Sequence, residues 1–324
     1  MRSSSCGRRL CLLVLAVLVS VACGPPTTAQ PRQRPLAALV LDQNFADPDV
    51  LAVQGTYYAY ATQPSDGSAN VSLATSTNLR TWLPAQHDPL PKLPSWAASG
   101  RTWAPDVSPA AGGFVMYFTA HSITPDVQCI GVARSRTPEG PFVAVGIKPL
   151  ICPAAEGGAI DPASFVDTGG RRYLLWKNDG NCCGKDTWLH LQPMAPDGLT
   201  VAGPARRLVR QDQAWEGHLV EAPTLIRHGA TYVLFYSAND YSGGRYATGY
   251  ATSPRIDGPY RKAAGPLLTS KNTGVIGPGG QDVVVDGRGH ATIVFHGWDP
   301  SVVYRRLYTA RLQWHGDVPV VSAP

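Results

Sequence analysis

At residues 44–62 the chain reads NFADPDVLAVQGTYYAYAT, the first copy of a pattern that recurs along its length. The stretch sets Asp47 and Asp49 around a proline. It then runs through a glycine turn between two segments rich in β-branched and aromatic residues. Two such segments around a glycine turn are typical of a β-hairpin. A pair of acids at the start of a buried strand indicates a rim position, where the carboxylates face solvent and ligand.

Similar segments follow four further acids in the chain. The five acids are Asp47, Asp106, Asp161, Glu221 and Asp282, with spacings of 59, 55, 60 and 61 residues. Each precedes a strand-like run, a glycine turn and a second run, as in TGGRRYLLWKN and RHGATYVLFYSA. A second motif, such as GVARSRTPEGPF and GYATSPRIDGPY, supplies another hairpin in each unit.

Four strands in each of five units predict an all-β fold, a single-domain five-bladed β-propeller. The composition agrees, because Gly (33) and Pro (29) are frequent while charged residues make up only 16%, which favours short strands and turns. A β-sandwich would not require this repeat length. Since the innermost strand of every blade lines the propeller axis, we expect the five acids to converge at one end of that axis.

The first residues have the composition of an export signal. The basic MRSSSCGRR precedes an apolar run at residues 10–22 that is too short for a confident membrane span. The run ends at Cys23 in VSVACG, which resembles a bacterial lipoprotein cleavage box. We therefore expect a signal peptide at residues 1–22 and acylation of Cys23, with cleavage after residues 27–29 as the alternative. Residues 23–38 would then be a flexible tether and residues 39–324 the propeller of a secreted or cell-envelope lipoprotein.

Charge limits the partners of the exported chain. Residues 1–22 contain three arginines and no acid, so their removal lowers the formal net charge from +5 to +2. No basic cluster interleaved with aromatic residues is present in the rest of the sequence, and we therefore predict no nucleic-acid binding. We expect a monomer that contacts a membrane only through its lipid anchor.

Four cysteines lie beyond the signal region, at Cys129, Cys152, Cys182 and Cys183. An even number in an exported chain indicates disulfides, and no His or Cys lies near them at zinc spacing. The preferred pairing is Cys129–Cys152 with a vicinal Cys182–Cys183 bond. Four free buried thiols are the alternative.

Converging acids point to a class of chemistry. Carboxylates held together in a partly dry pocket cannot all stay ionised with ordinary pKa values. Once their pKa values separate, one carboxyl can act as an acid and another as a base. The reaction that most often uses such a pair is hydrolysis of a glycosidic bond.

Several motifs resemble those of one enzyme family. FADPDV, IDPASF and VEAPTL are similar to the three acidic motifs of glycoside hydrolase family 43, and TWAPDV, ATSPRIDGPY and FHGWD extend the match across about residues 40–316. The resemblance implies a five-bladed propeller that hydrolyses arabinofuranosides or xylosides with inversion. It implies that Asp47 is the general base, Glu221 the general acid, and Asp161 the acid that modulates the pKa of Glu221 and orients it.

The resemblance also implies a substrate, an oligo- or polysaccharide. We expect an exo-acting α-L-arabinofuranosidase, with β-xylosidase, endo-arabinanase or galactofuranosidase activity as alternatives in the same family. A non-catalytic carbohydrate-binding propeller would lack one of the three acids. A retaining propeller glycosidase of the invertase type would carry NDPNG and RDP, whereas this chain has ADPDV and no RDP.

Other residues have two interpretations each. Asp47 alone could cap a turn before Pro48, and Asp49 is the second candidate for the base. Trp103 and Phe45 are expected to contact the sugar, with core packing as the alternative for both.

Polar residues are also expected on the axis. In the family that the chain resembles, a histidine often stands at the position of Gly280 and helps to hold a central metal ion or water cluster. Because this chain has glycine there, we predict no metal ligand and no required cofactor. A structural calcium ion is therefore in question. Gln281 and His296 are predicted to organise polar groups there and to contribute to substrate binding, with a neutral core role as the alternative for His296.

Overall fold

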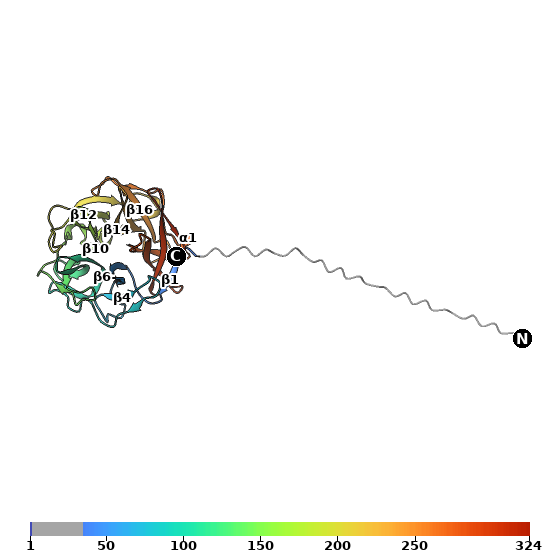
Figure 1. Cartoon of the computed structure of the whole chain (residues 1–324), viewed down its shortest axis with the longest axis horizontal. Coiled ribbons are helices and arrows are strands. Elements are labelled where there is room, and N and C mark those ends of the chain that lie inside the picture. The colour runs from blue at the N-terminus through green and yellow to red at the C-terminus, as the bar shows by residue number, and fades with distance from the viewer. Residues whose placement is uncertain (2–34) are drawn as a thin grey trace. The chain divides into compact units, whose positions relative to one another are not determined.

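The computed structural model describes Met1 and residues 35–324. The predicted signal peptide, Cys23 and most of the predicted tether lie outside the described residues. From residue 35 onward the chain forms five antiparallel sheets around a common centre, which Figure 1 shows in chain order from blue to red. The predicted all-β, five-bladed propeller is confirmed.

Each of the first four blades is a four-stranded sheet whose strands follow one another from the axis outward. Blade 1 contains β2 (Asp49–Val53), β3 (Thr56–Ala61), β4 (Ser72–Ser76) and β5 (Leu83–Pro84). Blade 2 contains β6 (Ala97–Ala110), β7 (Gly113–Ser122), β8 (Val127–Ser135) and β9 (Val143–Ala144). Blade 3 contains β10 (Ala159–Val166), β11 (Arg172–Asn178), β12 (Trp188–Pro193) and β13 (Arg206–Arg210). Blade 4 contains β14 (Val220–His228), β15 (Thr231–Ala238), β16 (Ala247–Ser253) and β17 (Arg261–Lys262).

The fifth blade closes the ring with five strands rather than the predicted four. It contains β18 (Ile276–Val285), β19 (Ala291–Trp298) and β20 (Arg305–His315). The outer edge of β20 pairs with both β1 (Ala38–Leu41) and β21 (Val318–Ser322). Strands from near the two ends of the described chain are thereby fastened to one strand, which protects the chain ends from fraying.

Helical segments are short and lie in the connections. They are η1 (Ala154–Glu156), η2 (Gly180–Cys183), η3 (Ala214–Glu216) and α1 (Ser270–Thr273). Within residues 35–324 no helix has the length and apolar character needed to cross a membrane.

Apolar side chains fill the spaces between neighbouring blades. Five buried clusters are present, one at each junction, and the cluster between blades 5 and 1 contains Phe45, Trp82 and Leu307. Phe45 has no exposed surface, so it cannot form a wall against a sugar. Our substrate-binding interpretation of Phe45 is wrong, because the ring is needed to fill this junction.

Both predicted cysteine pairs are present as disulfides. Cys129–Cys152 ties β8 to the segment before η1, and the Cys129 side chain is buried in the junction between blades 1 and 2. Cys182–Cys183 joins two consecutive residues of η2. Unlike the first pair, the second lies on the surface.

Candidate active site

One backbone feature recurs at the inner strand of all five blades. Asp47, Ala104, Asp161, Ala222 and Gly280 all have positive φ values, between 40° and 54°, in the left-handed region that side chains rarely adopt. The first four are followed by proline. In blades 2 to 5 the strand register shifts at this point. A bulge of this kind redirects side chains at the end of a strand.

The bulges show that our alignment of the five repeats from the sequence was shifted in three of them, at Asp106, Glu221 and Asp282. Successive left-handed residues are 57, 57, 61 and 58 positions apart, so the true equivalents of Asp47 are Ala104, Asp161, Ala222 and Gly280. The five acids that we grouped from the sequence therefore belong to different positions. Asp106 and Asp282 correspond to Asp49, two residues after the bulge, and Glu221 stands one residue before it.

The bulges bring three distant acids to one pocket. Asp47, Asp161 and Glu221 all line a pocket of about 340 Å³ together with Trp103, Lys177 and Arg305. This volume lies in the range of small-molecule sites. The innermost strands of blades 1 to 4 or the residues leading into them, together with β11 and β20, thus contribute to a common mouth, as expected for the end of a propeller axis.

Asp47 is held as an ionised carboxylate. The Thr62 hydroxyl donates to its Oδ2 at 2.7 Å, and Arg305 donates to its Oδ1 at 3.3 Å. Burial alone would raise the pKa of Asp47. The Arg305 guanidinium first, and then the neighbouring His296 and the Thr62 hydrogen bond, outweigh burial and hold the pKa of Asp47 well below its usual range.

Behind Asp47 lies a neutral histidine. The backbone N–H of Asp47 donates to His296 Nδ1 at 3.0 Å, so this nitrogen carries no proton and the ring is uncharged. Burial and then the Arg305 charge lower the pKa of His296, in agreement with this tautomer. Its side chain has no exposed surface, and Gly280 leaves the space that the ring needs, because a Cβ at Gly280 would lie 2.4 Å from Nδ1.

Gln281 is also enclosed by protein groups. Its amide nitrogen donates to the Ala222 carbonyl at 2.7 Å, and its amide oxygen accepts from Ser237 and Thr248. Neither Gln281 nor His296 lines the pocket. The prediction that they contact substrate is therefore wrong, whereas the prediction that they organise polar groups near the axis agrees with these bonds.

Glu221 and Asp161 form the opposite side of the pocket. Tyr246 donates its hydroxyl to Glu221 Oε1 at 2.8 Å, and the Lys177 ammonium donates to Oε2 at 3.0 Å. The Ala222 backbone N–H donates to Asp161 Oδ2 at 2.9 Å. Burial and the charge of Glu221, opposed by Lys177, raise the pKa of Asp161 to about 8. The Asp161 carboxyl therefore holds a proton at neutral pH, directly beside Glu221.

Aromatic and cationic groups complete the rim of the pocket. Trp103 is half-buried and lines the pocket, a position that suits the predicted wall against a sugar ring. Tyr241 is 48% exposed. The Arg305 guanidinium lies over the rings of Tyr241 and Trp298, at 5.2 and 5.9 Å from their centroids, which fixes the cation beside Asp47.

The comparison with known families agrees with this geometry. The model of the family described as Glycosyl hydrolases family 43 matches residues 37–319. The chain belongs to this family. Membership makes it a glycoside hydrolase, an enzyme that cleaves O-glycosyl bonds.

Two similar proteins are named for action on α-1,5-linked arabinose. Extracellular endo-alpha-(1->5)-L-arabinanase 2 of Bacillus subtilis is 27% identical over 254 residues, 70% of this chain and 52% of that protein. This chain thus spans about half the length of that relative. Extracellular exo-alpha-(1->5)-L-arabinofuranosidase ArbA of Cellvibrio japonicus is 24% identical over 302 residues, 84% of each chain. The crystal structure of a thermostable family-43 glycoside hydrolase has a TM-score of 0.75 and 26% identity, and the match covers 87% of this chain and 94% of that one.

Residues that our sequence interpretation missed lie beside the three acids. Lys177 stands within the apolar run LLWKN, and Arg305 stands at the start of β20. A lysine in the middle of a buried strand requires a charged partner, and this signal was readable in the sequence. Nothing comparable marks Arg305 or Tyr246, whose partners are 258 and 25 residues away.

Below the pocket, three further acids line the narrow axial channel, which has a volume of about 40 Å³. Asp49, Asp106 and Asp282 each accept a backbone N–H from the following blade, at 2.9, 2.8 and 2.8 Å. These bonds link blade 1 to 2, 2 to 3 and 5 to 1. The acids are therefore ties between blades.

The family resemblance raised the question of an axial calcium ion. Three carboxylates suit a hard cation, yet within residues 35–324 no three side chains among His, Cys, Asp and Glu are arranged to hold a metal. The donor set therefore does not fit an ion directly, and no step below depends on one.

The axial acids lead to a prediction about stability. Burial raises the pKa of Asp106 to about 6 despite the hydrogen bond from Ser164, and burial also raises the pKa of Asp282 to about 6. A carboxyl whose pKa is higher in the folded state favours folding in its neutral form, and this contribution is lost as pH rises from about 4 through 6. Asp106→Asn should therefore stabilise the protein at pH 8, by on the order of 1 kcal/mol, and have little effect at pH 4.

Thermal unfolding of Asp106→Asn and the wild type at pH 4, 6 and 8 would measure this effect. Asparagine can still accept the N–H of Ser164, so the tie between blades is kept. Asp167→Asn is the control, because this half-buried carboxyl lies in the turn after β10 and away from the axis. A melting-temperature difference that does not grow with pH would contradict the prediction.

Proposed function

We propose that this protein is an inverting, exo-acting α-L-arabinofuranosidase that releases terminal arabinofuranosyl residues from oligo- or polysaccharides. The observation that carries the proposal is the meeting of Asp47, Asp161 and Glu221 in a single pocket, with an ionised carboxylate at Asp47 and a carboxyl of raised pKa at Asp161 beside Glu221. This is the division of charge that acid–base hydrolysis requires.

In the proposed reaction, Asp47 acts as general base. Its low pKa keeps it ionised, so it can accept a proton from a water molecule that attacks the anomeric carbon. Glu221 donates a proton to the glycosidic oxygen as the bond from that oxygen to the anomeric carbon breaks. Because the water attacks from the face opposite the leaving group, the released sugar has the inverted configuration.

Asp161 is the proposed modulator of the acid. It lies beside Glu221, where burial and then the repulsion between the two carboxylates raise the pKa of Asp161. Asp161 loses its proton as pH rises through about 8, so we expect the activity of the wild type to decline on that alkaline side.

Replacing Asp161 by asparagine tests this role. Asparagine can still accept the Ala222 N–H, but it carries no charge to repel Glu221. Glu221 should therefore lose its proton at lower pH in the variant. We expect kcat/KM at pH 8 to fall roughly tenfold or more relative to its value at pH 5. The measurement is the pH–rate profile of both proteins, and an unchanged alkaline limb would argue against the modulator role.

The choice of arabinofuranosides rests on pocket size and relatives. A pocket of about 340 Å³ is at the small end of ligand sites and suits one sugar and part of the next. The exo-arabinofuranosidase of Cellvibrio japonicus and the endo-arabinanase of Bacillus subtilis are both named for α-1,5-linked arabinose. The latter name makes endo-arabinanase the second candidate.

Product analysis separates these candidates. A panel of nitrophenyl α-L-arabinofuranoside, β-D-xylopyranoside and β-D-galactofuranoside would identify the sugar. Linear arabinan should then yield only free arabinose from an exo-acting enzyme, and short oligomers from an endo-acting one. Proton NMR of the first product should show the inverted anomer. Saturable sugar binding without hydrolysis of any substrate would overturn the proposal.

We propose further that the enzyme is exported and held by an acylated Cys23. Support comes from the basic and apolar composition of residues 1–22 and from relatives that are named as extracellular. The mass of the N-terminal peptide of the mature protein tests this: a diacylglyceryl-modified Cys23 is expected, and an unmodified N-terminus beyond residue 29 would exclude the anchor.

A further inference from the structure

Lys177 is buried against the carboxylate that we propose as general acid, and this position poses a chemical problem. Its side chain has no exposed surface, and its ammonium lies 3.0 Å from Glu221 Oε2. A cation at this distance favours the ionised form of a carboxyl, whereas a general acid must hold its proton. Some feature of the site must limit the pull of the ammonium on Glu221.

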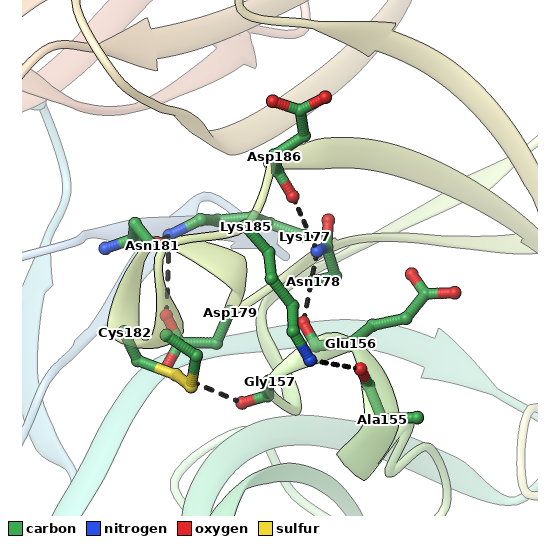
Figure 2. Close-up of a disulfide and its surroundings, with 11 residues drawn as sticks. Ala155, Glu156, Gly157, Lys177, Asn178, Asp179, Asn181, Cys182, Lys185 and Asp186 are labelled. Carbon is green, nitrogen blue, oxygen red and sulfur yellow. Dashed lines mark hydrogen bonds and ion pairs between the residues drawn. A yellow bond between two sulfur atoms is a disulfide. The ribbon is translucent and has the colours of Figure 1, made fainter.

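The other partners of Lys177 lie in η2 and at the residue just before it. The ammonium donates to Asn181 Oδ1 at 2.6 Å and lies 3.6 Å from Asp179 Oδ1. Its contact with Asn181 is therefore the shortest of the three. The three N–H donors of an ammonium match these two groups and Glu221, so the position of the nitrogen depends on the relative attraction of all three acceptors. Figure 2 shows Asn181 and Asp179 next to the end of Lys177.

The Cys182–Cys183 disulfide lies directly beside Asn181. It joins the two residues that follow Asn181 in η2, and Cys182 itself lines the pocket. The turn packs on blade 3 where Cys182 Sγ lies 3.7 Å from the Gly157 carbonyl oxygen (Figure 2). A Cβ at Gly157 would lie 2.4 Å from the Asp179 carbonyl oxygen, so only glycine allows this approach.

Exposed polar turns are mobile unless something fixes them. Residues 181–186 are all exposed, and few apolar contacts are available to hold Asn181 in place. The bond between adjacent cysteines removes conformational freedom from the backbone next to Asn181. It thus offers a covalent reason for the asparagine to remain within 2.6 Å of the buried ammonium.

We propose that Asn181, held in place by the Cys182–Cys183 turn, is a positioning residue that draws the Lys177 ammonium away from Glu221. The inference rests on the proposed role of Glu221 as general acid. Asn181 does not touch the reacting atoms in this mechanism. It sets how strongly Lys177 opposes protonation of Glu221, and thereby the upper pH limit of the reaction.

Other charged and titratable groups face Glu221, and they are the same in the wild type and in variants of Asn181 or of the disulfide. They are Lys177 of β11, Asp161 of β10, Asp179 after β11, Tyr246 before β16, Asp47 before β2 and His296 of β19. None of these residues is altered by a change at Asn181 or at the disulfide. A displaced pH limit therefore reports on the pairing of Lys177.

Two substitutions at Asn181 should act in opposite directions. Asn181→Ala removes the acceptor, so Lys177 pairs more closely with Glu221 and the alkaline limb of the pH–rate profile moves to lower pH. Asn181→Asp places an anion beside the ammonium, which draws it further away and moves the limb to higher pH. We expect displacements of about half a pH unit or more, or roughly threefold in kcat/KM on the alkaline side.

Removing the Cys182–Cys183 disulfide should reproduce the effect of Asn181→Ala. Cys182→Ser with Cys183→Ser is expected to move the limb in the same direction as Asn181→Ala, and to add little when combined with it. Cys129→Ser with Cys152→Ser is the matched control, because that disulfide lies outside the pocket, and its alkaline limb should match the wild type. If the control fails to fold, the opposite signs at Asn181 still decide the matter.

A readout independent of turnover separates this inference from the proposed function. Titration of the Glu221 side-chain carboxyl by ¹³C NMR should give the lowest midpoint pH in Asn181→Ala, an intermediate one in the wild type and the highest in Asn181→Asp. Displacement of both variants in one direction, or no displacement, would overturn the positioning role even if the enzyme is an active glycosidase. The expected order without hydrolysis of any glycoside would instead count against the proposed function.

Discussion

Replacing Glu221 by glutamine is expected to lower kcat/KM on an unactivated arabinofuranoside by about 10³- to 10⁴-fold. Glutamine has nearly the same shape and can still accept the Tyr246 hydroxyl that bonds to Glu221 Oε1 at 2.8 Å. It has no carboxyl proton to give to the leaving oxygen. The loss should therefore fall on the chemical step of the folded enzyme, in which Lys177 keeps Asp179 as its charged partner at a cost in stability.

The leaving group provides the diagnostic for this variant. A dinitrophenyl glycoside releases a weakly basic phenolate that needs no proton, so its hydrolysis by Glu221→Gln should fall far less, by about tenfold. The measurement is the ratio of kcat/KM for the two substrates in variant and wild type. Equal losses on both substrates would contradict the role of Glu221 as general acid.

The chain offers a matched control at Glu216. This glutamate is also buried, and it also bonds a lysine and a tyrosine, Lys262 at 2.7 Å and Tyr236 at 2.7 Å. It does not line the pocket. Glu216→Gln should reduce stability, because Lys262 loses its buried partner. In the folded variant, the ratio of kcat/KM for the two substrates should equal that of the wild type.

The sequence predicted the architecture and the three acids of the pocket for a physical reason. Hairpins with glycine turns are local, and each blade repeats the same local chemistry, so a single chain contains five copies of the signal. The bulges are also local, and a proline follows the left-handed residue in four of the five blades, but the repeats were aligned on their acids and not on these prolines. Glu221 was consequently aligned with Asp47 although it stands one residue before the bulge, where Ala222 is the true equivalent.

The remaining features depend on contacts between blades. Phe45 reads as an aromatic residue near a catalytic motif, yet ring closure places it between blades 5 and 1. Arg305 comes to Asp47 only when the fifth blade meets the first, across 258 residues. The order of pKa values in the pocket depends on these partners. It follows from the assembled ring and could not be assigned from any one motif.

Replacing Asp47 by asparagine should have an effect of similar size through a different step. Asparagine can still accept the Thr62 hydroxyl, but it cannot take a proton from water, and kcat/KM should fall by about 10³-fold or more. The loss caused by Asp47→Asn should be nearly the same for activated and unactivated substrates, because attack by water is impaired with both. The loss caused by Glu221→Gln should differ between them. Sodium azide, which is a nucleophile without a base, should restore turnover and form a glycosyl azide of inverted configuration.

The matched control for Asp47 is Asp49, which stands two residues further along the same inner strand and was the second candidate for the base. Its carboxylate accepts the Val107 N–H in the axial channel and does not line the pocket. Asp49→Asn should therefore keep kcat/KM within a few-fold of the wild type, without any response to azide. If Asp49→Asn instead loses activity and gains it back with azide, while Asp47→Asn does not, the base has been assigned to the wrong side of Pro48. The bulge at Asp47 would then serve the fold and not the reaction.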